Sequence, residues 1–316
     1  MFNLDQFLLA QVRSVDRRVQ NANAFHQHSV EIRHVARSVA KLQESLGLNP
    51  PVASLTPPTA KPHVLLRYVK NDEHFILKVY GRRHSGEARV QAWWHSNGVP
   101  CAEPIEFGDE PYSWMLMRFA QAESTGNASM DEVSLLSATR EMAAIASAAH
   151  YLAVPTGEWG RYSEHAATEF SASISALRCG GFNVDSSVFD LAAMVYAPTP
   201  QDTLIHGDLC PANCLKLTSG AYSWIDAGGY LGEASIDAAR WIVRTTPSLE
   251  ATETLVSEWI VSEPSLDYGS LRRAVALESY IEAGVGQIVK SEQRLTSGNI
   301  DIETVRLLEQ AKYFTE

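Results

Sequence analysis

The chain has 316 residues, of which 45% are hydrophobic and 20% are charged, and its formal net charge at pH 7 is −11. At roughly 150 residues per domain, this length corresponds to about two compact domains. The ordinary balance of apolar and charged residues excludes a disordered or fibrous chain. The acidic charge argues against a general nucleic-acid-binding protein, because such proteins need a positive field to meet phosphates.

The charge is unevenly distributed along the chain. Residues 1–119 hold 14 Lys/Arg and 11 Asp/Glu, whereas residues 120–316 hold 12 Lys/Arg and 26 Asp/Glu. The first part is therefore mildly basic and the second strongly acidic. Any function proposed for the chain has to be consistent with this asymmetry.

Cysteine usage and hydropathy indicate where the protein works. Four scattered cysteines do not make a disulfide framework. The N-terminal residues lack the pattern of a secretory signal, and no apolar stretch approaches the ~18 residues that span a bilayer. We therefore expect a cytoplasmic protein that does not contact membranes.

Helical and strand periodicities divide the chain into a β-rich part and a helical part. Residues 1–48 are expected to be helical, with an amphipathic helix over 29–46. Residues 63–80 predict two strands joined by a turn at 70–73, followed by a helix over 86–94 and strands at 104–107 and 112–117. The remainder predicts helices interrupted by short strands at 203–207 and 222–226; the helices cover 129–152, 163–178, 186–196, 233–244, 249–262, 268–290 and 301–313. This order predicts an α+β fold.

The segments LIHGDLCPANCL (204–215) and YSWIDAGG (222–229) carry the most informative polar residues. Asp208 and Asn213 follow the first short strand, and Asp226 ends the second. Such oxygen ligands suit Mg²⁺ held against a nucleotide phosphate. His206, Asp208 and Asn213 also match the H-x-D-x-x-x-x-N spacing of kinase catalytic loops, in which the Asp is the base and the Asn binds metal.

A lysine upstream is consistent with a kinase-type site. Lys78 lies inside the apolar strand FILKVY, where a charge is otherwise unfavourable. Glu87 opens the next predicted helix. Kinase-type sites need a strand lysine on the ATP phosphates and a helix glutamate paired with it.

These motifs, together with WIDAGGYLGEASIDAARW (224–241), resemble the aminoglycoside phosphotransferase-like family of small-molecule kinases, which includes choline kinase-type enzymes. The resemblance implies a protein kinase-like two-lobed fold, with a small β-rich N-lobe and a larger, mainly helical C-lobe. We expect an N-terminal helical extension over 1–48, a nucleotide-binding N-lobe over 49–119 and a C-lobe over 120–316. The resemblance leaves the extension without a role.

The resemblance also implies roles for individual residues, with ATP and Mg²⁺ as cofactors. Asp208 would be the catalytic base, and Asn213 and Asp226 would hold Mg²⁺. Lys78, oriented by Glu87, would hold the ATP phosphates, and a hinge around residues 117–120 would bind adenine through Met117 and Phe119. His206 and Asp237 would brace the catalytic loop. No G-x-G-x-x-G precedes the Lys78 strand, so the phosphate-covering loop is unassigned.

The sequence constrains the identity of the phosphoryl acceptor less than it constrains the type of reaction. The acidic C-terminal part favours a cationic hydroxyl compound, such as an aminoglycoside or amino sugar, and hence a role in antibiotic resistance. Glu278 and Glu282, four residues apart on one predicted helix, are candidate amine ligands. The acidic surface could equally serve solubility alone. A metabolic sugar or amino-alcohol kinase of the choline or homoserine type and a catalytically inactive pseudokinase are the alternatives. No role is assigned to His150, and the oligomeric state is left open.

Overall fold

The computed structural model of the chain describes residues 2–21, 26–56, 63–82, 86–120, 122–125, 132–246, 248–292 and 301–315. The chain divides into two compact units. The N unit comprises residues 1–95 and 101–121, and the C unit comprises residues 96–100 and 122–316. Within the described ranges, no helix has both the length and the apolar character needed to cross a bilayer. The predicted α+β class is confirmed.

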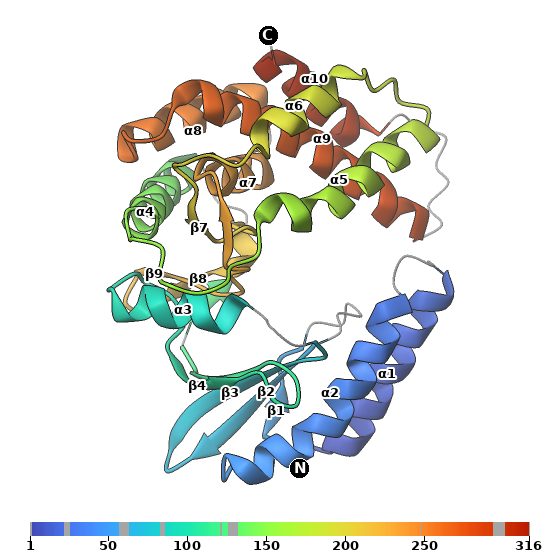
Figure 1. Cartoon of the computed structure of the whole chain (residues 1–316), viewed down its shortest axis with the longest axis vertical. Coiled ribbons are helices and arrows are strands. Elements are labelled where there is room, and N and C mark those ends of the chain that lie inside the picture. The colour runs from blue at the N-terminus through green and yellow to red at the C-terminus, as the bar shows by residue number, and fades with distance from the viewer. Residues whose placement is uncertain are drawn as a thin grey trace. The chain divides into compact units, whose positions relative to one another are not determined.

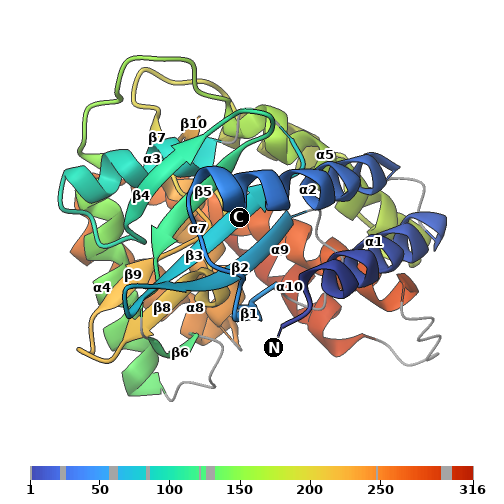
Figure 2. The ribbon, with the colours of Figure 1, turned by 90° about the horizontal axis from the view of Figure 1, so that it is seen from below.

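In the N unit, the described strands form an antiparallel five-stranded sheet in the order β1-β2-β3-β5-β4 (Figure 2). Its elements are α1 (Leu4–Asn21), α2 (His26–Ser45), β1 (Ala53–Ser54), β2 (His63–Lys70), β3 (Glu73–Tyr80), α3 (Gly86–Ser96), β4 (Pro104–Gly108) and β5 (Trp114–Arg118). The two strands predicted within 63–80 are β2 and β3. They join through Asn71 and Asp72, both with positive φ, as expected of a two-residue hairpin. The connection between β1 and β2, residues 57–62, lies outside the described residues.

The two faces of this sheet have different partners, because successive strand residues point to opposite sides. Phe75, Leu77 and Val79 of β3 belong to a hydrophobic core that also contains buried residues of α1 and α2, among them Val15 and Ile32. α1 and α2 therefore cover one face of the sheet, and the predicted amphipathic helix over 29–46 lies in α2 up to Ser45, where α2 ends. Lys78, between Leu77 and Val79, is directed to the other face.

The end of β3 lies directly against α2. A Cβ atom on Gly81 would come within 2.2 Å of the Glu31 carbonyl oxygen, so only glycine allows this approach. The His34 Nδ1 atom lies 3.2 Å from the Gly81 carbonyl oxygen, and the His34 ring stacks on Tyr112. α2 is thereby anchored at the point where the chain leaves the Lys78 strand.

The C unit is mainly helical. The described helices are α4 (Glu132–His150), α5 (Tyr162–Cys179), α6 (Ser187–Val195), α7 (Ser235–Thr245), α8 (Leu249–Ser262), α9 (Tyr268–Glu292) and α10 (Ile302–Thr315). The long helix α9 packs against α5, α7 and α10 (Figure 1). The sequence predicted each of these helices; the start expected for the first one, at residue 129, lies outside the described residues.

Short strands of the C unit bring the two polar segments together. β6 (Ala122–Thr125), β8 (Cys214–Leu217) and β9 (Tyr222–Trp224) form one described sheet, and β7 (Thr203–Ile205) pairs with β10 (Tyr230–Gly232). A further 3₁₀ turn covers Pro211–Asn213. β7 and β9 are the strands predicted at 203–207 and 222–226, whereas β1, β6, β8 and β10 were not predicted. Through these pairings, the loop after β7 and the loop after β9 become neighbours.

Candidate active site

The loop after β7 turns sharply at a glycine. Gly207 has a φ of 74°, a left-handed conformation that side chains with a Cβ rarely adopt. A Cβ atom here would also lie 2.8 Å from the ring of Tyr230. Both constraints explain glycine in the His-Gly-Asp sequence, and the turn directs Asp208 away from the strand.

His206 joins this loop to the loop after β9. Its Nε2 atom lies 3.0 Å from the Ile225 carbonyl oxygen, which can only accept a hydrogen bond. The Asp208 amide donates to its Nδ1 atom at 3.3 Å. Nε2 must therefore carry the proton and Nδ1 the lone pair, so His206 is a neutral imidazole. Burial is the main reason why the pKa of His206 lies below its ordinary value, which agrees with that assignment.

Asp237, in the first turn of α7, holds the backbone of the loop. Its two carboxylate oxygens accept hydrogen bonds from the amides of His206, at 2.7 Å, and Gly207, at 2.8 Å. The side chain is fully buried. Burial raises the pKa of Asp237, but hydrogen bonds and charge from His150, together with the bonded loop, hold it below the ordinary value. The two residues predicted to brace the loop both contact it.

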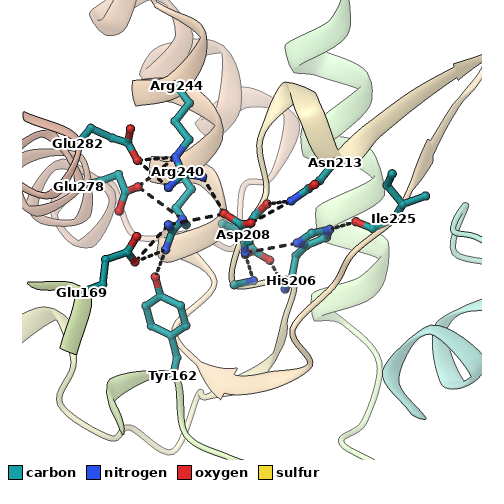
Figure 3. Close-up of polar contacts among 12 residues, drawn as sticks. Tyr162, Glu169, His206, Asp208, Asn213, Ile225, Arg240, Arg244, Glu278 and Glu282 are labelled. Carbon is teal, nitrogen blue, oxygen red and sulfur yellow. Dashed lines mark hydrogen bonds and ion pairs between the residues drawn. The ribbon is translucent and has the colours of Figure 1, made fainter. Parts of the chain in front are cut away.

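Asp208 is partly exposed and is held from two sides (Figure 3). Its Oδ1 atom accepts a hydrogen bond from Arg244 Nη1 at 2.7 Å, and its Oδ2 atom accepts one from Asn213 Nδ2 at 3.0 Å. The exposed fraction of the side chain is 41%. Although desolvation raises the pKa of Asp208, the guanidinium groups of Arg240 and Arg244 hold it below the ordinary value. Asp208 is therefore a fixed carboxylate at neutral pH.

Asn213 and Asp226 lie on joined segments. The Ile225 amide donates to the Asn213 carbonyl oxygen at 3.0 Å, which places Asp226 one residue from that contact. Asp226 has a φ of 63°; positive φ is uncommon for residues other than glycine and often occurs at functional sites. The Asn213 amide nitrogen donates to both the carbonyl and the carboxylate of Asp208, so its amide oxygen is directed elsewhere.

This donor set fits Mg²⁺. Mg²⁺ usually takes one or two carboxylates from the protein and completes its octahedral shell with waters and phosphate oxygens. Asp226 would supply a carboxylate and Asn213 an amide oxygen. In the part of the chain that the structure describes, no group of three His, Cys, Asp or Glu residues forms a ready-made cage. The residues present suit a metal that arrives with a phosphate.

Beside Asp208 lies a cluster of charges that the sequence did not reveal. Arg240 and Arg244 lie one turn apart on α7. Arg240 is buried and lies near Glu169 and Glu278, and it donates to the Tyr162 hydroxyl. Apart from Asp208, the partners of the two arginines come from α5 and α9, far away in sequence. The sequence held one signal for this cluster, the spacing of Arg240 and Arg244 from Asp237. Residues three and seven positions further along a helix lie on the same face.

Glu278 and Glu282, the predicted amine ligands, both face these arginines. Glu282 accepts a hydrogen bond from Arg244 Nε at 2.6 Å. Glu278 lies 3.4 Å from Arg240 Nε and 3.5 Å from Arg244 Nε. Burial raises the pKa of Glu278 to about 7 despite these arginines. Their role as amine ligands stays a prediction, and the charges that they face in this structure belong to the protein itself.

In the N unit, Lys78 and Glu87 form the predicted pair. Lys78 Nζ donates to both carboxylate oxygens of Glu87, at 2.8 and 2.7 Å, and both side chains are buried. Gln91, one turn further along α3, donates to Glu87 at 3.3 Å. The lysine is thus fixed at one position on the sheet, next to the helix.

We expect Lys78→Met to lower the free energy of unfolding by about 3–5 kcal/mol, because removal of one partner leaves a buried charge uncompensated. The double variant Lys78→Met/Glu87→Leu should recover most of that loss. Urea denaturation followed by tryptophan fluorescence measures both. Equal destabilisation of the single and double variants would show that the loss comes from packing rather than from the unpaired glutamate.

The predicted hinge lies at the end of β5. Met117 is buried in the sheet, paired with Ile76. The Phe119 amide donates to the His74 carbonyl oxygen at 3.0 Å, and the Phe119 ring lies against the Arg67 guanidinium. The Phe119 N–H is therefore engaged within the N unit. An adenine contact through Phe119 would have to use its carbonyl group.

Comparison with known proteins adds a family and a fold. Residues 62–219 match the model of the phosphotransferase enzyme family. No protein of curated function matches the chain in sequence. The segment matched by the family model includes Lys78, Glu87, Asp208 and Asn213.

Several solved structures are similar. Amicoumacin kinase hAmiN has a TM-score of 0.58 and 14% identity, covering 87% of this chain and 92% of its own. Choline kinase LicA from Streptococcus pneumoniae has a TM-score of 0.55 and 14% identity, covering 88% and 97%. A thermostable mutant of an aminoglycoside phosphotransferase has a TM-score of 0.52 and 14% identity, covering 86% and 97%. The expected protein kinase-like fold is confirmed.

Proposed function

Because the chain belongs to the phosphotransferase enzyme family and is a small-molecule kinase, we propose that it transfers the γ-phosphoryl group of ATP to a hydroxyl group of a cationic small molecule, such as an aminoglycoside or amino sugar. The observation that carries this proposal is the Asp208 carboxylate. It is held by Arg244 and Asn213, it is partly exposed, and it lies on a loop braced by Asp237. This arrangement is what a hydroxyl acceptor needs from a kinase catalytic loop.

Asp208 orients the acceptor and takes its proton. Each carboxylate oxygen has two lone pairs, and the hydrogen bonds from Arg244 and Asn213 use one on each oxygen. A remaining lone pair can accept the acceptor O–H. As the acceptor oxygen forms its bond to the γ-phosphorus, the bond from that phosphorus to the bridging oxygen breaks, ADP leaves, and the proton passes to Asp208.

Asn213 and Asp226 would hold the divalent metal, Mg²⁺ in our proposal. When bound, this ion would neutralise charge on the phosphate oxygens. Amicoumacin kinase hAmiN, which shares the fold, was solved with AMP-PNP and Ca²⁺. In the N unit, Lys78 would contact the ATP phosphates, with Glu87 fixing its position, and Met117 and the Phe119 carbonyl would contact adenine.

The cationic acceptor is supported by the charge around Asp208. Glu169, Glu278 and Glu282 together with Asp208 supply four carboxyl groups against the two guanidinium groups of Arg240 and Arg244. Glu169 and Glu282 keep 32% and 22% of their side chains exposed. Glu278 is buried and, with its pKa raised to about 7, only partly ionised at neutral pH. The other three carboxylates still outnumber the two guanidinium groups, so the charge around Asp208 is net negative, which attracts a cation and opposes an anion.

A coupled ADP-release assay over aminoglycosides, amino sugars, neutral sugars, choline and homoserine tests this proposal. The matched pair is glucosamine and glucose, which differ by one amino group. We expect turnover to favour the amine, and the KM for a cationic acceptor to rise with salt because charge screening weakens its attraction. Preference for the neutral sugar would reject the cationic acceptor. Tight Mg·ATP binding without turnover of any compound would indicate a pseudokinase.

A further inference from the structure

The last residue of α4, His150, lies between two buried carboxylates. Its Nε2 atom is 3.2 Å from Asp237 Oδ2, and its Nδ1 atom is 2.9 Å from Glu263 Oε1. The exposed fractions of the three side chains are 6%, 0% and 1%. The His150 carbonyl oxygen also accepts a hydrogen bond from the Thr203 hydroxyl at the start of β7. His150 thus connects α4, α7, the end of α8 and the strand that leads to Asp208.

Both carboxylates accept hydrogen bonds from N–H donors besides His150. Asp237 accepts two backbone amides from the loop, and the second oxygen of Glu263 accepts the Trp259 indole N–H at 2.9 Å. An ionised carboxylate can only accept hydrogen bonds, so both ring nitrogens of His150 must donate. His150 is then an imidazolium, whereas His206, which faces a carbonyl oxygen and an amide N–H, is neutral.

We propose that His150 is a positioning residue for phosphoryl transfer: as an imidazolium, it fixes the Asp237 carboxylate, which in turn holds the His206 and Gly207 amides and the loop that presents Asp208. The effect on catalysis rests on the proposed function, whereas the charge state of His150 does not. Burial by itself lowers the pKa of His150, but hydrogen bonds to Asp237 and Glu263 and their charges raise it to about 9. Asp237 and Glu263 are the charged groups that face its ring, and His206 shares the Asp237 carboxylate.

Imidazole NMR of the full chain labelled with ¹⁵N-histidine tests the charge state directly. At pH 7.5, we expect His150 to show two protonated nitrogens and His206 to show only a protonated Nε2. His150→Gln assigns the signal, and the exposed His95→Gln is the matched control. The His206 and Gly207 amide shifts should titrate with His150 in the wild type and lose that titration in His150→Gln. A neutral His150 at pH 7.5 would overturn the proposal.

A second variant covers the case in which His150→Gln does not fold. Glu263→Gln keeps the volume and an acceptor for Trp259, but it removes one of the two charges that face His150. We expect His150 to lose its proton at a lower pH in this variant than in the wild type. An unchanged titration would contradict the bridging arrangement.

Kinetics test the positioning role separately. With Mg·ATP hydrolysis to water as the probe, His150→Gln should lower kcat at least tenfold and leave the Kd for Mg·AMP-PNP within about twofold. The wild type should lose activity as the pH rises through about 9, and His150→Gln should lack that alkaline loss. Equal losses in kcat and nucleotide affinity would reject a positioning role. A chain that shows the expected NMR signals but transfers phosphate neither to water nor to any of the acceptors above would refute the proposed function instead.

Discussion

We expect Asp208→Asn to lower kcat for phosphoryl transfer by about 10²–10⁴-fold, the contribution usual for a positioned general base. The amide nitrogen of asparagine cannot take up the proton of the substrate hydroxyl. In addition, an amide beside Arg244 no longer offers the charge that this guanidinium faces at 2.7 Å. The nucleotide affinity should change little, because Asp208 is not among the residues proposed to bind ATP.

Initial rates of ADP release, with the Kd for Mg·AMP-PNP from calorimetry, measure these two quantities. The exposed Asp190→Asn on α6 is the matched control, since it makes the same chemical change in the same unit. If Asp208→Asn keeps kcat within about tenfold of wild type, Asp208 is not the base. A parallel loss of nucleotide affinity would indicate instead that the substitution has disturbed the metal site.

Asp237→Asn is expected to lower the free energy of unfolding by about 3–5 kcal/mol, because it breaks a fully buried ionic network. One oxygen of Asp237 serves the Gly207 amide, and the other serves the His206 amide and His150. The amide of asparagine replaces one of these acceptors with a donor. The matched control is Glu258→Gln, which removes a helix-to-helix ion pair with the exposed Arg140 and should cost no more than about 1 kcal/mol.

The pH dependence of unfolding checks the same network. The pKa of Asp237 is lowered by folding, so its contribution is present above the ordinary Asp range and is lost as the pH falls through the folded value. The pKa of His150 is raised to about 9, so its contribution is complete below its ordinary value of 6.5 and is lost as the pH rises through about 9. Urea denaturation from pH 5 to 10 should show the alkaline loss in the wild type. A flat profile between pH 7 and 10 would contradict the paired imidazolium.

Much of the fold was predictable, because long periodic segments bury one face. The β2–β3 hairpin and the helices of the C unit belong to this class. Lys78 was recognisable because a charge within an apolar strand requires a partner, and Glu87 lies only nine residues further on. The arginine partners of Glu278 and Glu282 could not be recognised in the same way. Nothing in the sequence of α9 specifies that α7 will place Arg240 and Arg244 against it.

By itself, the sequence determined the spacing of His206, Asp208 and Asn213, because a single loop brings residues so close along the chain into one site whatever packs around them. Only the tertiary structure decided the charge states of that site. His150 and Glu263 are 113 residues apart, and each is an unremarkable residue at a helix end until folding places the His150 ring between Glu263 and Asp237. A protonation state depends on the atoms that surround a group, and in a buried site those atoms come from segments that only folding brings together.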